Sequence, residues 1–292
     1  MDRYQKAIAD SRVVGDDTAV KAAVERIVEK SKENMKPEVW SYLLGSIDLT
    51  TLSTEDSEKS VAAFTRRVND FDNDYPQYPH VAAICVYSNF AEVVKENLDV
   101  DGVDVCVVAG CFPSSQTFTE VKIADVALAV SNGANEVDVV MNVGMFRDDN
   151  YEDLCDELIE LKNTAKDAVF KVIIESGCLK TAEDIKKASI LSMWSGADFI
   201  KTSTGKIYPG ASLEAAYVMC QCIKEYYELT GRKIGFKAAG GVRTTEEAVA
   251  YYTLVKEILG EEWLTPSLFR LGASSLANNV LSSLEGESVK YF

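Results

Sequence analysis

Two lysines occupy apolar segments in which a charged side chain has few routes to water. The first, Lys201, lies in the segment 198–206, where Phe199 and Ile200 precede it and Gly205 ends the predicted strand. A lysine that cannot reach water loses the solvation of its ammonium form, and its neutral amine is a nucleophile toward carbonyl carbon. Lys201 therefore suggests amine chemistry on a carbonyl compound.

The second lysine, Lys237, lies in the next apolar segment, 233–241. A helix predicted over 212–228 separates the two segments, and a strand, a helix and a strand in succession form parallel neighbours. Each lysine shortly precedes a glycine turn, which places both at the carboxyl ends of adjacent strands. Two ammonium groups this close repel each other, so we expect one of the amines to be neutral near pH 7.

Other polar side chains fall on further predicted strands. Asp48 ends the first strand, Asp138 lies among valines in the fourth, and Lys171 and Glu175 lie in the fifth. A carboxylate among apolar residues needs a partner. Asp138 can hold a lysine in an ion pair, transfer protons, or do both. The position of Lys171 at the start of its strand favours a buried ion pair over a direct role in chemistry.

Two glycine-containing loops could hold a phosphate. One follows the strand of Lys237, the other follows the last predicted strand, and each leads into a helix. Glycines let backbone N–H groups approach an anion, and a helix N-terminus favours negative charge. The alternative is that these are only the tight turns and the helix cap that any such fold needs. The residues proposed for the phosphate are Lys206, Gly240, Gly241, Gly272, Ser274 and Ser275.

The alternation of strands and helices predicts the fold. Eight strands are expected, over 43–49, 81–87, 103–109, 135–142, 170–176 and 268–273 and in the two lysine segments. Helices are expected over 54–68, 89–97, 119–131, 151–166, 181–195, 212–228 and 244–259. A series of this number and length favours the α/β class and a closed (β/α)8 TIM barrel over an open sheet. No GxGxxG follows the first strand, which weakens a dinucleotide-binding alternative.

The ends of the chain are expected to differ from the barrel. Residues 1–40 are predicted to be an N-terminal helical extension, with a helix from about 16 to 33, and residues 41–292 the barrel domain. Residues 285–290 lack periodicity, so the last residues are expected to be a mobile tail.

Composition narrows the class of protein. The 292 residues carry a net charge of −16, which argues against nucleic acid and anionic membrane surfaces as partners. Seven scattered cysteines are typical of reduced thiols, and His80 is the single histidine, so a histidine-based triad or zinc site is poorly supported. Without a membrane span or signal core, a cytosolic protein is expected.

The two lysine motifs together resemble those of the deoxyribose-phosphate aldolases, a class I aldolase family. The first reads Phe-Ile-Lys-Thr-Ser-Thr-Gly-Lys over 199–206, and the second reads Gly-Phe-Lys-Ala-Ala-Gly-Gly-Val-Arg over 235–243. The match extends, in the family's order, to 47–50, 83–87, 136–140, 171–175 and 272–275. It spans roughly residues 40 to 284. The family often has proline where Ala238 stands, which implies a looser backbone after the second lysine.

The resemblance implies a role for each matching residue. It makes Lys201 the Schiff-base lysine, Lys237 the second lysine that favours the neutral form of the first, and Asp138 the proton-handling carboxylate. It places the substrate against Asp48, Cys85, Lys171, Thr204, Lys206, Gly240, Gly241, Gly272, Ser274 and Ser275. From its apolar strand alone, Cys85 would be a core residue. Some relatives use a tyrosine on a flexible tail, a role that Tyr291 could fill here.

The expected activity is reversible cleavage of 2-deoxy-D-ribose 5-phosphate to acetaldehyde and D-glyceraldehyde 3-phosphate, without metal or organic cofactor. Its partners would be phosphosugars and aldehydes, and a homo-oligomer, dimer or tetramer, is compatible. Two alternatives stay open. One is another lysine-imine barrel enzyme, such as a transaldolase or a dehydratase. The other is a barrel that binds sugar phosphates without catalysis, which would need the glycine loops but not two lysines.

Overall fold

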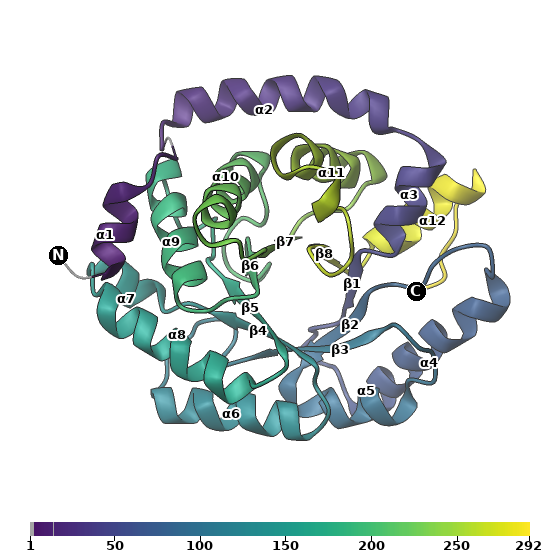
Figure 1. Cartoon of the computed structure of the whole chain (residues 1–292). Helices are drawn as coiled ribbons and strands as arrows, with labels where there is room; N and C mark the ends of the chain where they lie inside the picture. The colour runs from purple at the N-terminus through teal and green to yellow at the C-terminus, as the bar shows by residue number, and fades with distance from the viewer. Residues whose placement is uncertain (1–2, 14) are drawn as a thin grey trace.

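The computed structural model describes residues 3–13 and 15–292 and shows a barrel surrounded by helices (Figure 1). Eight parallel strands close in chain order, with the last paired to the first. The strands are β1 Ile47–Thr50, β2 Ala83–Tyr87, β3 Asp104–Ala109, β4 Glu136–Val140, β5 Val169–Ile173, β6 Phe199–Lys201, β7 Gly235–Ala239 and β8 Phe269–Ala273. The predicted (β/α)8 barrel is confirmed, with strands mostly shorter than expected.

Helices connect the successive strands and form the outer ring, and further helices precede the first strand and follow the last. They are α1 Arg3–Asp10, α2 Asp17–Ser31, α3 Pro37–Leu44, α4 Glu58–Asp74, α5 Ala91–Asn97, α6 Thr119–Ser131, α7 Val143–Arg147, α8 Tyr151–Ala165, α9 Ala182–Trp194, α10 Leu213–Thr230, α11 Thr245–Leu259 and α12 Leu276–Glu285. Short 3-10 turns occur at Lys32–Asn34, Ser88–Phe90 and Glu261–Trp263. Among the described residues, no helix combines the length and apolarity that a membrane crossing requires.

Side-chain caps stabilise the N-termini of two helices that follow βα loops. Ser212 caps α10 and Thr244 opens α11 with a full capping box, because each hydroxyl accepts a hydrogen bond from a backbone N–H of the first turn. The helix predicted from residue 54 begins only at Glu58. Ser57 and Ser60 supply the capping box there.

The segment before the first strand differs from the prediction. Leu43 and Leu44, expected to be the start of that strand, end α3, which Pro37 opens and Gly45 terminates. A short apolar run does not distinguish a buried strand from a buried helix, and the proline at the first helical turn decides it. Helix α3 also crosses the predicted boundary at residue 40. Upstream of it, α2 lies across the outer faces of α10 and α11 (Figure 1).

The C-terminal segment is docked, so the expectation of a mobile tail is wrong. The Asn278 side chain accepts hydrogen bonds from the backbone N–H groups of Tyr291 and Phe292, and both rings pack on Phe71 of α4. The Tyr291 hydroxyl donates to Asp74 at 2.9 Å. A polar side chain from α12 and an aromatic cluster thus hold residues that show no periodicity in sequence.

The barrel interior is divided by polarity. On β2 and β3 it is lined by small apolar and thiol side chains, Ala83, Cys85, Cys106 and Val108. The rest of the interior carries charged side chains from β1, β4, β5, β6, β7 and β8. Since ions in such a place must be paired, the charged half requires a specific network.

Candidate active site

The two lysines of the sequence analysis are neighbours inside the barrel. Lys201 ends β6 and is in register with Lys237 in the middle of β7. Their side chains are 4% and 0% exposed. The predicted pairing of the two lysine strands is therefore confirmed.

One carboxylate oxygen joins the two amines. Asp138 on β4 places its Oδ2 atom 2.7 Å from the Nζ of Lys201 and 2.7 Å from the Nζ of Lys237. The two nitrogens are thus no more than two hydrogen-bond lengths apart. Asp138 also accepts from the Nζ of Lys171 through its Oδ1 atom, at 3.1 Å. A single carboxylate therefore contacts three amines.

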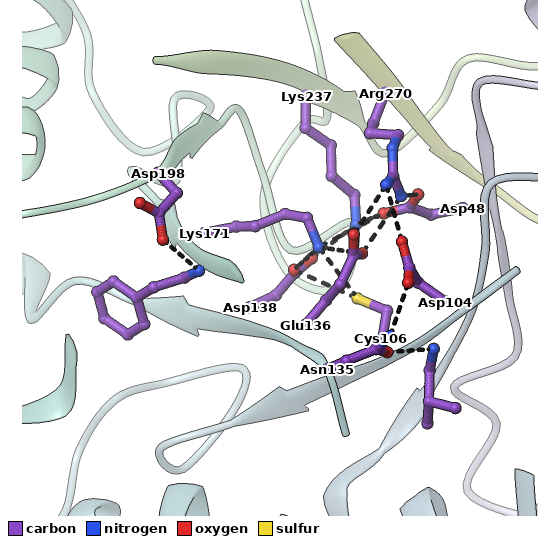
Figure 2. A network of polar contacts seen from close by, with 12 residues as sticks. Asp48, Asp104, Cys106, Asn135, Glu136, Asp138, Lys171, Asp198, Lys237 and Arg270 are labelled. Atoms are coloured by element: carbon purple, nitrogen blue, oxygen red, sulfur yellow. Dashed lines mark hydrogen bonds and ion pairs between the residues drawn. The ribbon is translucent and has the colours of Figure 1, made fainter. Parts of the chain in front are cut away.

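An ion network extends from Lys171, Lys237 and Asp138 to side chains of β1, β4 and β8 (Figure 2). Lys237 pairs with Asp48 of β1, and Lys171 pairs with Glu136 of β4 at 2.5 Å. Arg270 of β8 closes the network, because its guanidinium donates to Asp48 at 2.6 Å and to Glu136 at 2.8 Å. All of these side chains are 5% exposed or less.

The network fixes the charge of most of its members. Burial disfavours ionisation of Asp138, but Lys171, Lys201 and Lys237 outweigh burial and hold the pKa of that carboxyl well below its usual range. Burial likewise opposes charge on Lys237, yet Asp138 and Asp48 raise the pKa of its amine well above normal. Lys237 is therefore the amine of the pair that stays protonated, as the sequence analysis requires of one of them.

A cavity of about 400 Å3 opens above Lys201. Its lining includes most of the residues predicted to bind substrate, namely Thr204, Lys206, Gly240, Gly241, Gly272, Ser274 and Ser275. The first βα loop, residues 50–53, and Arg243 complete the wall. The Lys201 side chain and the glycine-containing loops expected to hold phosphate therefore line the same cavity.

Glycines allow the phosphate-type loops to approach each other. Gly240 has φ +82°, and a Cβ there would lie 3.0 Å from the Cα atoms of Gly205 and Gly210. Gly241, at φ +88°, continues the left-handed turn. Backbone therefore packs against backbone at this wall of the cavity, and any side chain at position 240 would push the loops apart.

Two cationic side chains and the N-terminus of a helix make this wall of the cavity favourable for anions. Ser274 and Ser275 precede α12, and the Ser275 hydroxyl makes no capping hydrogen bond. The free first turn of a helix attracts anions. Lys206 borders the same space while its Nζ donates to the carbonyl of Leu52, and Arg243 adds a second cation.

Three residues predicted to contact substrate do not line the cavity. Asp48 and Lys171 are 0% exposed and Cys85 is 1% exposed, and all three lie within the barrel interior. Asp48 and Lys171 are instead occupied by the ion network, while Cys85 packs beside Cys106. The structure places them beneath the cavity floor, and their contact with substrate stays a prediction. Tyr291, held by Asp74, does not line it either.

Within the described residues, two groups of side chains come close enough to share a metal ion, but their surroundings are unfavourable for one. They are Cys85, Cys106 and Asp138, and Asp48, Cys106 and Glu136, each with ligand atoms within 4.8 Å. Every carboxylate in these groups is already paired with lysine or arginine. A cation would have to displace those ammonium or guanidinium groups.

Sequence reasoning missed Arg270 and left Glu136 and Arg243 without a role in the site. The signal for Arg270 was present, because an arginine stands between Phe269 and Leu271 in a predicted strand. Its partners come from β1 and β4, far apart in sequence, so closure of the barrel is needed to find them. Ala238, where a looser backbone was expected, lies within β7 in register with Leu271.

Comparisons with known proteins agree with this geometry. The model of the DeoC/LacD family aldolases matches residues 43–260. A Caenorhabditis elegans protein is 40% identical over 273 residues, which cover 92% of this chain and 89% of the relative. The deoxyribose-phosphate aldolase of Mus musculus is 39% identical over 249 residues, covering 80% of this chain and 77% of the relative.

Solved structures give the same result. An aldolase designated QR15 superposes with a TM-score of 0.67 at 31% sequence identity, over 83% of this chain and 96% of that one. The matched family segment contains all three interacting lysines and Asp138. The chain therefore belongs to the DeoC/LacD family of aldolases.

Proposed function

We propose that the protein is a deoxyribose-phosphate aldolase, which reversibly cleaves 2-deoxy-D-ribose 5-phosphate into acetaldehyde and D-glyceraldehyde 3-phosphate. The observation that carries the proposal is the pair Lys201 and Lys237 on one oxygen of Asp138 at the floor of the cavity. A nucleophilic amine beside a permanent cation and a carboxylate is what imine formation and proton transfer require.

The reaction begins with the neutral amine of Lys201, which adds to the C1 aldehyde of the open-chain sugar. Loss of water gives a protonated imine. This cation accepts the electron pair of the C2–C3 bond as that bond breaks and a proton leaves the C3 hydroxyl. D-Glyceraldehyde 3-phosphate departs and an enamine remains on Lys201. Protonation at C2 and hydrolysis of the resulting imine then release acetaldehyde.

Asp138 has the position for the proton steps. Its Oδ2 atom is hydrogen bonded to Lys201, so it can exchange protons with the nitrogen or with a water beside it. Lys171, Lys201 and Lys237 hold this carboxylate in its ionised form, and the raised pKa of Lys237 keeps that second amine charged beside Lys201. The residues 240–241 and 272–275 would hold the phosphate and so fix the reacting carbons over the amine.

The test is turnover of the purified protein with 2-deoxy-D-ribose 5-phosphate, with release of D-glyceraldehyde 3-phosphate followed in a coupled assay. We expect steady turnover without added metal and none after Lys201→Ala. A transaldolase-like enzyme would instead act on ketose phosphates and transfer a larger fragment. A barrel that only binds sugar phosphates would bind the compound without releasing either product.

We also propose that the protein forms a homo-oligomer in the cytosol. An Aeropyrum pernix relative is described as a tetramer. On this chain Phe118, the N-cap residue of α6, is 78% exposed, and Val121 and Leu128 within α6 are 52% and 62% exposed. A ring helix normally has a polar outer face, so this apolar one suits contact with a second copy. The seven free cysteines suit a reducing compartment.

A further inference from the structure

The ion network beneath the cavity contains several members to which the proposed reaction gives no step, and Arg270 is one of them. Arg270 occupies the position on β8 that is in register with Lys237 on β7, which is in turn in register with Lys201 on β6. Three cationic side chains thus follow one another around the barrel. Any role of Arg270 in the reaction rests on the proposed function.

Arg270 is held firmly and is nearly inaccessible. Its Nη1 atom donates to Asp48 Oδ1 at 2.6 Å, and its Nη2 atom donates to Glu136 Oε1 at 2.8 Å. The side chain is 5% exposed. Arg270 contacts neither the cavity nor Lys201. Any effect on the reaction must therefore act through Asp48, Glu136 and their lysine partners.

The network contains more cations than anions. Within the described part of the chain, its buried carboxylates are three, Asp48, Glu136 and Asp138. Four basic groups contact them, Lys171, Lys201, Lys237 and Arg270. If every group were ionised, one positive charge would be left without a counterion in a site with little water. Unbalanced charge in such a site is costly, and loss of one proton removes it.

The missing proton must come from a lysine, because guanidinium does not lose its proton in proteins. Lys171 and Lys237 each contact two or more carboxylates, and these carboxylates raise the pKa of both amines against the effect of burial. Lys201 contacts Asp138, an oxygen of which it shares with Lys237. It is also the lysine of the three that borders the cavity. Lys201 is therefore the lysine of the three with the fewest carboxylate partners.

We propose that Arg270 is a positioning residue that keeps the Lys201 amine uncharged, by supplying from the far side of the network a fixed cation that the three carboxylates cannot match. Without this arginine, three lysines would face three carboxylates. Lys201 could then keep its proton, because each positive charge in the network would have a negative counterpart. The nucleophile is thus prepared by a residue that never meets the substrate.

Of the other titratable groups beside the network in the described part of the chain, Cys85 is the one that bears on the charge count. Burial raises the pKa of Cys106 well above normal, so this thiol is neutral. A hydrogen bond from Cys106 lowers the pKa of Cys85, the one thiol that could add a negative charge. Glu175 accepts hydrogen bonds from Thr204 and pairs with none of the four cations. Asp104, 3.4 Å from Arg270, is 39% exposed and is solvated.

A double-mutant cycle that removes charges tests the proposal. Arg270→Met removes the cation, Glu136→Gln removes one of its anions, and the double variant removes both. The measurement is kcat/KM for 2-deoxy-D-ribose 5-phosphate from pH 5 to 10, with circular dichroism at each pH to confirm folding. Cys85→Ser, which cannot ionise, is included to check that the thiol does not set the profile.

Arg270→Met is expected to move the rising limb of the plot of kcat/KM against pH to higher pH by about one unit. The value of kcat/KM would then fall roughly tenfold near neutrality and recover at alkaline pH. Glu136→Gln is expected to move the rising limb to lower pH, and the double variant to return it near that of the wild type. Damage to the fold alone would lower activity at every pH and would not be reversed by a second substitution. Cys85→Ser is expected to leave the position of the limb unchanged.

The proposal is overturned if Arg270→Met is folded with the wild-type profile, or if Glu136→Gln fails to reverse its shift. If Arg270→Met does not fold, the proposal is tested by Glu136→Gln alone. A rising limb of kcat/KM that moves to higher pH in that variant contradicts the proposal. A limb that moves in Cys85→Ser also overturns it, because the thiol would then belong in the charge count. Failure of the proposed function would look different, since the wild type itself would not cleave the sugar.

Discussion

At the scale of single residues, the reactivity of Lys201 depends on side chains that it shares with Lys237. Both amines contact the same oxygen of Asp138, and Lys237 is the one held in its charged form by Asp138 and Asp48. Electrostatic neighbours of this kind, acting where water is excluded, have large effects on the ionisation of a nucleophile.

Lys237→Leu should therefore lower kcat by about 100-fold or more, the range typical of positioned charged groups, and raise the pH optimum. The reason is that Lys201 would become the sole amine partner of Asp138 Oδ2 and keep its proton. Steady-state kinetics over pH would measure both effects. Lys233→Leu, on a partly exposed lysine just before the same strand, is the matched control and should be near wild type. Unchanged kinetics in Lys237→Leu would mean that burial alone tunes Lys201.

At the scale of elements, two βα loops and the start of α12 form the wall expected to hold phosphate. Gly240→Ala places a methyl group 3.0 Å from Gly205 and Gly210 and should raise KM for the phosphorylated sugar by about tenfold, or ~1.4 kcal/mol. Imine formation with acetaldehyde, which has no phosphate, should change much less. Gly102→Ala, at the same φ of +82° but in open space, isolates the backbone cost. Equal losses with both substrates would argue against a phosphate site.

At the scale of the whole molecule, we propose that residues 1–40 form a helical extension of the barrel and no separate domain. Val20, Val24 and Ile27 of α2 are buried, and this helix lies against α10 and α11. Deleting residues 1–31 removes several kcal/mol of apolar burial and should lower Tm by several degrees. Trapping of acetaldehyde on Lys201 should persist, since the cavity lining lies outside the deleted segment. An unchanged Tm would indicate an independent unit.

The ion network also makes stability depend on pH at both ends of the range. The pKa values of Asp48 and Asp138 are lowered in the folded protein, so their contribution is present above about pH 4 and is lost as pH falls. Those of Lys171 and Lys237 are raised, so theirs is present below about pH 10 and is lost as pH rises. Tm measured from pH 3 to 11 should therefore show a plateau with a fall on each side. A Tm that climbs steadily toward acid would contradict this.

Local patterns predicted the barrel and the paired lysines because each depends on neighbouring segments. A strand, a helix and a strand that follow one another lie side by side, so Lys201 and Lys237 could be joined from sequence alone. Contacts that depend on closure of the barrel could not, as in the pairing of Arg270 on β8 with Asp48 on the neighbouring β1, 222 positions away in sequence. Docking of the tail through Asn278 likewise depends on which surfaces meet after folding.

The account depends most directly on which amine forms the imine. The decisive measurement is borohydride reduction of the protein with acetaldehyde, followed by peptide mass spectrometry. We predict one reduced two-carbon adduct, located on Lys201, with none after Lys201→Ala. An adduct on Lys171 or Lys237 would contradict the account, and so would an unmodified chain at saturating acetaldehyde.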